Sequence, residues 1–214
     1  MERDAVVALE IQGPFTSALA TLALLTSAAA DLKEAFSRFG PARPTLEISV
    51  DLPLPALASP HIAELLGATL EDADLDPAHV WLEIEAADVV MDVEHGAARL
   101  RALREVGVQL AIDGFGAVGG SLGLLKRLPV QALKVDAMVI ARLGSDRLAE
   151  STALALASLA QSFDLMAIAQ GVLSEDNLRK VRALAFDRAQ GPCLIPAVLP
   201  NSLGRLPLVV PQHA

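Results

Sequence analysis

Acidic side chains stand at or near the C-terminal ends of several short apolar segments. Asp51, Glu83, Asp113 and Asp136 occupy such positions, and Lys134 lies two residues before Asp136. Several carboxylates gathered around a lysine in a partly closed site are costly unless something neutralises their charge. A divalent cation with oxygen ligands does so, and one or two such ions can activate water against a phosphodiester. These residues therefore predict a divalent-cation site.

The segments that carry these acids have the pattern of β-strands. Each is short and mostly apolar, and most alternate between apolar and other residues with period two. The apolar side chains on one side of each strand suit packing against helices. The side chains on the other side include the acids at the strand ends. The expected strands are residues 46–51, 80–85, 108–113, 131–136, 165–170 and 186–190, with a further strand near residues 5–11.

Helical stretches lie between most of these strands. Ser59 followed by Pro60 predicts a helix start, with serine as the N-cap and proline at the first helical position. A second helix is expected to end at Gly107, and a third is expected to begin at Ser174. The first predicted strand is followed by a long helix over residues 16–39.

Strands that alternate with helices predict a parallel sheet with helices outside it. Seven or eight such units favour a (β/α) TIM-type barrel, in which the C-terminal ends of the strands form the active-site face. The alternative is an antiparallel sheet with one solvated face, where the same alternation is routine. The helices between the strands argue against it. Because no Pro/Gly-rich linker divides the chain, we expect residues 1–214 to form a single domain.

Composition and charge argue against several classes of function. The net charge is −9, so duplex nucleic acid is a poor partner, because phosphate binding needs a positive face. The single cysteine, Cys193, excludes an intrachain disulfide framework and favours a reducing, cytoplasmic location. Residues 15–30, the most apolar stretch, include several Thr and Ser residues and fall short of the roughly 20 apolar residues of a membrane span. We therefore expect no membrane span.

Residues 111–136 closely resemble the signature of the EAL domain, the cyclic di-GMP phosphodiesterase family. They read AIDGFGAVGGSLGLLKRLPVQALKVD, against DDFGTGYSSL followed by LKRLPVDxLKID in the family. The resemblance covers about residues 45–200 and implies a (β/α) barrel of EAL type. Further motifs match in family order: ISVDL at 48–52 with SVNLS, LEIE at 82–85 with LEITE, AIAQGV at 167–172 with VVAEGV, and AQG at 189–191 with AQGY.

The resemblance implies roles for the matched residues. In the family the barrel mouth binds one or two Mg²⁺ or Mn²⁺ ions, and cyclic di-GMP is opened to linear pGpG. Glu83 and Asp113 stand at metal-binding positions of the family. Lys134 matches the lysine beside the attacking water, and Asp136 is its neighbour on the same strand face. Gln190 matches the glutamine of the AQG motif.

Departures from the family pattern fall mostly on the same site. Asp51 replaces a metal-binding Asn, and Gly114 replaces the second Asp of DDFG, a ligand of the second metal. Gln170 replaces the metal-binding Glu of the AEGVE motif, and a neutral amide binds hard cations more weakly and cannot accept a proton. In the flexible loop, residues 117–121 have lost the family Thr and Tyr.

The N-terminal motif can be aligned with the family in two ways. One alignment makes Glu10 the signature glutamate and hence a metal ligand; the other lays Ile11 and Gln12 on the family's first strand and leaves no signature glutamate. In both, the arginine that follows the family signature is missing. The span from Glu10 to Ser49 also looks shorter than in the family. We therefore expect a fold shortened at its N-terminus, with residues 1–44 as divergent or truncated first βα units.

These departures predict a degenerate EAL domain. Losing a catalytic metal or its ligands commonly costs several kcal/mol of transition-state stabilisation, and each ~1.4 kcal/mol is a factor of ten in rate. The leading hypothesis is therefore a non-catalytic domain that regulates cyclic di-GMP signalling through protein–protein contacts or ligand sensing. The alternatives are a weak metal-dependent phosphodiesterase and a cyclic di-GMP receptor that does not hydrolyse its ligand.

The same resemblance bears on cofactors and partners. No cofactor is expected in a non-catalytic domain, whereas residual activity would require Mg²⁺ or Mn²⁺. We expect a protein partner, and the family resemblance makes a homodimer plausible. The missing arginine and the altered loop count against cyclic di-GMP as a ligand.

Overall fold

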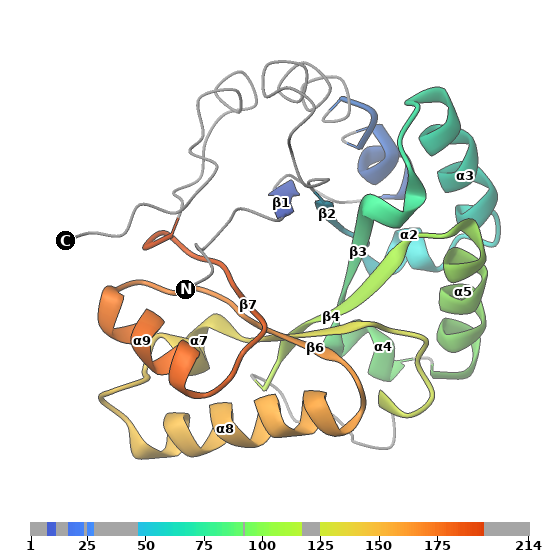
Figure 1. The fold of residues 1–214 in the computed structure, drawn as a ribbon. Helices are drawn as coiled ribbons and strands as arrows, with labels where there is room; N and C mark the ends of the chain where they lie inside the picture. Colours follow the sequence, from blue (N-terminus) through green and yellow to red (C-terminus); the bar gives the residue numbers. More distant parts are fainter. Residues whose placement is uncertain are drawn as a thin grey trace. The chain divides into compact units, whose positions relative to one another are not determined.

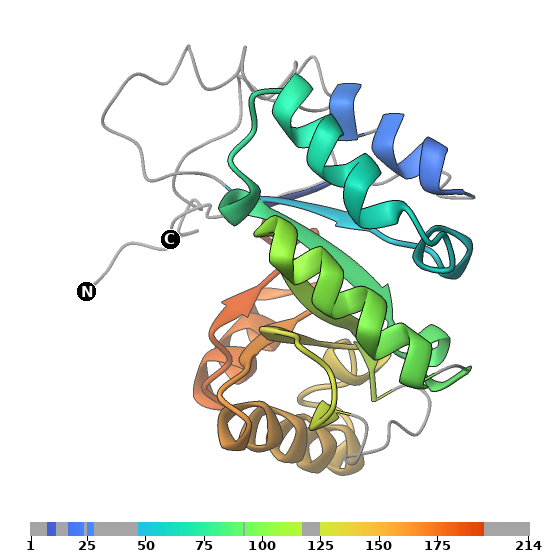
Figure 2. The same ribbon diagram turned by 90° about the vertical axis from the view of Figure 1, so that its right-hand side faces the viewer.

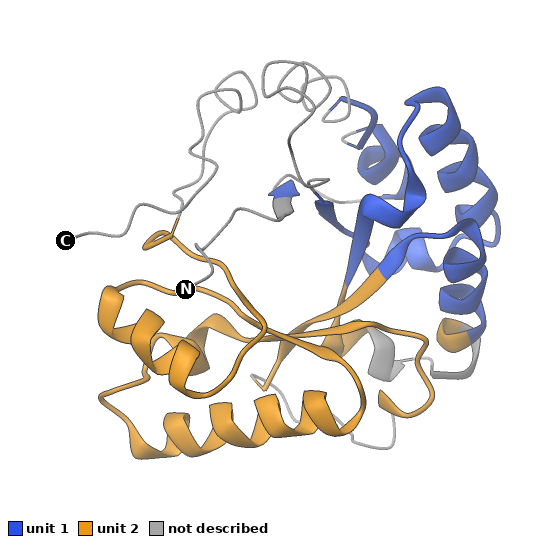
Figure 3. Cartoon of the chain, viewed as in Figure 1, with its two compact units in different colours: residues 1–83, 98–109, 197–214 blue, residues 84–97, 110–196 orange. Residues whose placement is uncertain are grey.

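The structure of the protein is a computed structural model that describes residues 8–11, 17–23, 25–27, 47–91, 93–116 and 125–194. The chain divides into two compact units (Figure 3). Unit 1 comprises residues 1–83, 98–109 and 197–214, and unit 2 comprises residues 84–97 and 110–196. Strand order in the sheet follows chain order, from β1 to β7 (Figure 1).

Unit 1 is built on parallel strands. Strand β1 (Ala8–Ile11) pairs with β2 (Glu47–Asp51), and β2 pairs with β3 (Val80–Glu85), whose last two residues belong to unit 2. In β2 and β3 the alternating apolar side chains are buried, and those of Ile48 and Val50 are at most 1% exposed. The helical elements described in this unit include α2 (Leu54–Leu57), α3 (Ile62–Asp72), the 3₁₀ turn Pro77–His79 and helical residues 18–23 and 25–27.

Unit 2 continues the same parallel pattern. Strand β5 (Ala132–Val135) pairs with β4 (Gln109–Phe115) and β6 (Met166–Ala169), and β6 pairs with β7 (Arg188–Ala189). Helix α8 runs alongside β5 and β6, as both ribbon views show (Figures 1 and 2). The helices that begin or lie in this unit are α4 (Ala86–Met91), α5 (Val93–Val106), α7 (Ala137–Ile140), α8 (Arg147–Ser162) and α9 (Glu175–Ala183).

The predicted strands are confirmed, with ends that shift by a few residues. The strand expected at residues 80–85 has those bounds, and the one expected at 131–136 is β5, two residues shorter. Among the strands that the structure describes, every pairing within each unit is parallel, so the antiparallel alternative is wrong. No helix in the described part of the chain combines the length and hydrophobicity of a transmembrane span.

Helix ends show where local sequence signals decide the structure. Ser174 is the N-cap of α9, and its Oγ accepts a hydrogen bond from the Asn177 N–H at 3.2 Å. Gly107 directly follows α5 and has a φ of +108°, a positive value of the kind that glycine commonly adopts just after a helix. The predicted start at Ser59 is wrong: α3 begins at Ile62 with His61 as its N-cap, because residues 58–61 form a turn after α2. Most of the helix predicted over 16–39 lies outside the described residues.

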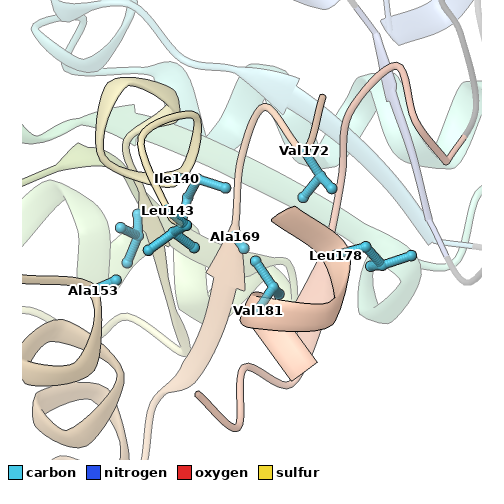
Figure 4. Packing of buried hydrophobic residues seen from close by; sticks show 8 residues of the cluster. Ile140, Leu143, Ala153, Ala169, Val172, Leu178 and Val181 are labelled. Carbon is cyan, nitrogen blue, oxygen red and sulfur yellow. The ribbon is translucent and has the colours of Figure 1, made fainter. Parts of the chain in front are cut away.

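The core of unit 2 is a cluster of aliphatic side chains between helices and sheet. Ile140 and Leu143 follow β5, Ala153 comes from α8, and Leu178 and Val181 come from α9 (Figure 4). Small alanines on α8 and β6 let the helices approach the sheet closely, which agrees with a chain that has 3% aromatic residues. This packing holds the ends of β5, β6 and β7, where candidate site residues lie.

A surface ion pair fastens α9 to α8. Lys180 Nζ donates to Glu150 Oε1 at 2.9 Å, and the Gly144 N–H donates to the same oxygen at 3.2 Å. The hydrogen bond and the charge of Lys180 lower the pKa of the Glu150 carboxyl. A carboxyl whose pKa is lowered by folding stabilises the fold above its unfolded-state pKa, and that contribution is lost as pH falls through the folded-state pKa.

In Lys180→Met, we expect the pKa of Glu150 to rise toward its ordinary value. The Gly144 N–H remains as a donor, so the remaining lowering should be small. NMR titration of the Glu150 side-chain carboxyl carbon measures the change. Arg179→Met is the matched control, because Arg179 pairs with Asp176 on the same helix. A Glu150 pKa that is equal in both variants would contradict the assignment.

Candidate functional site

In unit 1 the structure brings Asp51 and Glu83 together at the ends of β2 and β3. The two residues are register partners, and a carboxylate oxygen of one lies within 4.8 Å of a carboxylate oxygen of the other. Glu83 is 4% exposed and Asp51 is half-buried. The Leu52 N–H donates to the Glu83 carbonyl at 2.8 Å and holds the two strands in register at this point.

Ser49 orients the Glu83 carboxylate. The buried Ser49 hydroxyl donates to Glu83 Oε1 in a short hydrogen bond. Ser49 and Glu83 lie on the side of their strands that carries the acids. Ser49 pairs with Trp81, two residues before Glu83. Sequence reasoning did not single out Ser49, although its place two residues before Asp51 on the same parity was a usable signal. Glu10 lies opposite Ser49 in the register of β1 and β2 and is half-buried.

In unit 2, Asp113 and Gly114 lie at an irregularity of strand β4. Ile112 pairs with Leu133, but Phe115 rather than Gly114 pairs with Val135, so β4 carries one extra residue. Gly114 has a φ of +66°, and its N–H donates to Asp113 Oδ1 at 2.7 Å. A bulge with glycine in the left-handed region is typical of strands that re-aim a side chain. Here it sets the direction of the half-buried Asp113 carboxylate.

Lys134 and Asp136 occupy different environments, although they are two residues apart. Lys134 lies within β5 and is only 1% exposed. Asp136 follows the strand and is the N-cap of α7, where its Oδ1 accepts from the Met138 N–H at 2.7 Å. One oxygen of Asp136 is therefore committed to helix capping. Asp136 directly follows β5, and its N–H donates to the Phe115 carbonyl at 3.1 Å; its predicted place beside Lys134 on one strand face stays a prediction.

Asp136, Gln170 and Gln190 form a row at the ends of three strands. They follow Val135, Ala169 and Ala189 directly, and these three residues are aligned across β5, β6 and β7. The Gln170 N–H donates to the Val135 carbonyl at 3.2 Å, and the Gln190 N–H donates to the Ala169 carbonyl at 2.8 Å. The backbone thus sets the spacing of these side chains, as expected at the C-terminal ends of parallel strands.

The chemistry of the donor sets fits a hard divalent cation. Carboxylate oxygens are the ligands that Mg²⁺ and Mn²⁺ prefer. Asp51 and Glu83 offer such oxygens in unit 1, and one of them is oriented by a serine hydroxyl, as metal ligands commonly are. In unit 2, Asp113 offers a further carboxylate, whereas Gln170 offers an amide.

Comparison with known proteins places the chain among similar sequences and structures. The family model described as EAL domain matches residues 13–197. The crystal structure of the EAL domain of Mycobacterium smegmatis DcpA is similar with a TM-score of 0.86 and 29% identity, covering 98% of this chain and 92% of that one. This similarity confirms the predicted fold class, a (β/α) TIM-type barrel of EAL type.

Two curated relatives match the sequence at similar levels. "Uncharacterized protein y4lL" of Sinorhizobium fredii is 30% identical over 148 residues, which are 69% of this chain and 18% of that protein. "Cyclic di-GMP phosphodiesterase NbdA" of Pseudomonas aeruginosa is 30% identical over 146 residues, which are 68% of this chain and 19% of that protein. The chain spans about a fifth of the length of these relatives.

Proposed function

Because the chain belongs to the EAL domain family, we propose that it is a degenerate, non-catalytic member that regulates cyclic di-GMP signalling through protein–protein contacts or ligand sensing. The observation that carries this proposal is the composition of the strand ends. Gly114 and Gln170 stand where the family resemblance implies carboxylate ligands, and neither can supply an anionic oxygen.

Carboxylates suited to a divalent cation nevertheless remain at the ends of β2 and β3. Asp51 and Glu83 would hold a Mg²⁺ or Mn²⁺ ion, and Asp113 is the further ligand that the resemblance implies. When bound, such an ion supplies charge neutralisation and a water of lowered pKa. Ser49 orients Glu83 by its hydrogen bond, and the bulge at Gly114 directs Asp113. Lys134, buried in β5, would lie beside the attacking water in an active relative of this family.

The magnitude of the loss favours a domain without useful hydrolysis. Each ~1.4 kcal/mol of lost transition-state stabilisation lowers the rate tenfold. Two missing ligands at a few kcal/mol each lower the rate by several orders of magnitude, if their effects add. The fold does not depend on these ligands, because the strands are held by backbone pairing and apolar packing.

The test is incubation of the full chain with cyclic di-GMP and either Mg²⁺ or Mn²⁺, followed by chromatography of the nucleotides. We expect no pGpG above the level of the protein-free control, and an active EAL phosphodiesterase serves as the positive control. Turnover at about 1 s⁻¹ or faster, within the ordinary range of enzymes, that disappears in Lys134→Ala would overturn the proposal.

Calorimetric titration with cyclic di-GMP, with and without the metal ion, separates the two modes of regulation. Heat of binding without hydrolysis would assign the domain to ligand sensing. The absence of heat at high micromolar ligand would leave protein–protein contact as its mode of action. The same titration tests the alternative function, a receptor that binds cyclic di-GMP without hydrolysing it.

A further inference from the structure

A buried amide joins helix α9 to the chain segment that leaves strand β5. That segment, residues 136–146, runs from the end of β5 to α8 and is called the β5–α8 connection below. The Asn177 side chain is 6% exposed, and its Nδ2 donates to the Leu143 carbonyl at 3.1 Å. A buried polar group that loses its partner is costly, so this bond favours one arrangement of α9 against the connection.

Apolar packing and a surface contact support the same arrangement. Leu143 belongs to one core cluster with Leu178 and Val181 of α9 (Figure 4). At the surface, Lys180 of α9 donates to Glu150 Oε1 in the first turn of α8, at 2.9 Å. We call the Asn177–Leu143 and Lys180–Glu150 contacts together the α9 clamp.

The β5–α8 connection links the clamp to Asp136 through overlapping turns. The Leu143 N–H donates to the Ile140 carbonyl at 3.1 Å, and the Ile140 N–H donates to the Asp136 carbonyl at 3.3 Å. The Asp136 side chain caps the same turn by accepting from the Met138 N–H. Hydrogen-bonded turns that overlap fix the backbone dihedrals between them. A displacement of Leu143 therefore passes to Asp136.

Helix α9 is also fixed to the ends of β6 and β7. It follows Gln170 after a short segment, within which the Val172 N–H donates to the Gln190 carbonyl at 3.0 Å. In the same segment Gly171 lies against the start of α7, because a Cβ atom added to it would be 2.5 Å from Ala137 Cβ. The clamp therefore joins all three members of the row at the ends of β5, β6 and β7.

We propose that the α9 clamp positions Asp136 relative to Gln170 and Gln190, with Asn177 as the positioning residue, and that loosening the clamp at the surface moves Asp136. The inference deepens the proposed function, on which it rests for the regulatory role of the strand ends. It names α9 as the element through which a contact at the surface reaches them. The Lys180 side chain, 43% exposed, is the part of the clamp that such a contact can reach.

Native-state hydrogen exchange of backbone amides tests the clamp, followed by NMR on the full chain without nucleotide or metal. Asn177→Leu has a similar volume and removes the buried donor. Lys180→Met removes the surface contact and leaves the core unchanged. Arg179→Met is the matched control, because Arg179 pairs with Asp176 within α9 itself.

Two amides compare the β5–α8 connection with the rest of unit 2. The Ile140 amide lies within the connection, whereas the Met166 amide donates to the Gln131 carbonyl at the start of β6, at 2.9 Å. Global unfolding exposes both amides, so the ratio of their exchange rates isolates local opening of the connection. The chemical shift of the Met138 amide, which donates to Asp136 Oδ1, reports separately whether Asp136 has moved.

We expect Asn177→Leu to raise the exchange rate of the Ile140 amide by about tenfold or more relative to the Met166 amide, because the Leu143 carbonyl loses a buried donor. Lys180→Met should raise the same ratio only a few-fold, since a surface ion pair contributes little. The Met138 amide should shift in both variants, and further in Asn177→Leu. The control variant should match the wild type in both measurements.

A wild-type exchange ratio in Asn177→Leu would overturn the inference, as would a Met138 amide that does not shift in that variant. If Asn177→Leu does not fold, Lys180→Met decides, and a wild-type ratio and shift there would reject the clamp. Equal changes in Arg179→Met would reject it too. No cyclic di-GMP is present in these measurements, so their outcome is separate from the proposed function, which fails only if that dinucleotide is hydrolysed at enzyme rates.

Discussion

Gly191→Ala is expected to destabilise the protein by roughly 3 kcal/mol, through backbone strain and overpacking together. Its Cβ would lie 2.3 Å from the Val172 nitrogen and 2.5 Å from the Val172 oxygen, and backbone atoms cannot move aside as a flexible side chain can. The φ of +151° adds strain for any residue with a Cβ. The close approach exists because the Val172 N–H donates to the Gln190 carbonyl at 3.0 Å.

The measurement is the free energy of unfolding from urea titration. Gly67→Ala is the matched control: it lies within helix α3, and its Cβ would meet only Val106 Cγ1, at 3.9 Å. Replacing a helical glycine by alanine should stabilise the protein by about 0.5–1 kcal/mol. The two substitutions add the same methyl group, so opposite signs would isolate the backbone contact at Gly191. Equal unfolding free energies for the two variants would contradict it.

Glu83→Ala is expected to remove the stabilisation of the fold by Mn²⁺. At an ion concentration of about 100 times the Kd, binding stabilises the native state by about 2.7 kcal/mol. For a chain of this size that corresponds to a rise in Tm of roughly 5–10 °C. Removing Glu83 takes away the most buried carboxylate of the pair with Asp51, so the variant should show little or no rise under the same conditions.

Ser49→Ala should give an intermediate result. It leaves both carboxylates in place and removes only the hydroxyl that orients Glu83, and such supporting groups commonly contribute 10–100-fold to metal affinity. Ser151→Ala is the control, because its hydroxyl donates to a helix carbonyl at the surface of α8. A thermal shift with Mn²⁺ that persists in Glu83→Ala would rule out the cation site at Asp51 and Glu83.

The organisation of residues 1–214 as one domain stays a prediction. The N-terminal shortening and the roles given to Glu10 are likewise predictions, because most of residues 1–46 lies outside the described part of the chain.

Strand positions could be predicted because each strand carries its own signal. In β3 the alternation of Val80, Leu82 and Ile84 with Trp81 and two glutamates follows from the pleat of a single strand, and the observed bounds agree. Helix starts were predictable where a side chain caps the backbone locally, as at Ser174. The start at Ser59 was mispredicted, because the preceding short helix and its turn occupy those residues, which the serine–proline pair does not reveal.

The sequence alone determined the fold class and the approximate place of the candidate site, because both follow from local periodicity and from which residue types end each strand. Only the tertiary structure decided which carboxylates lie together and what they contact. Asp136 caps a helix, Ser49 orients Glu83, and the bulge at Gly114 directs Asp113. These contacts depend on the register between strands and on a one-residue bulge in β4, and neither is encoded in the periodicity of a single strand.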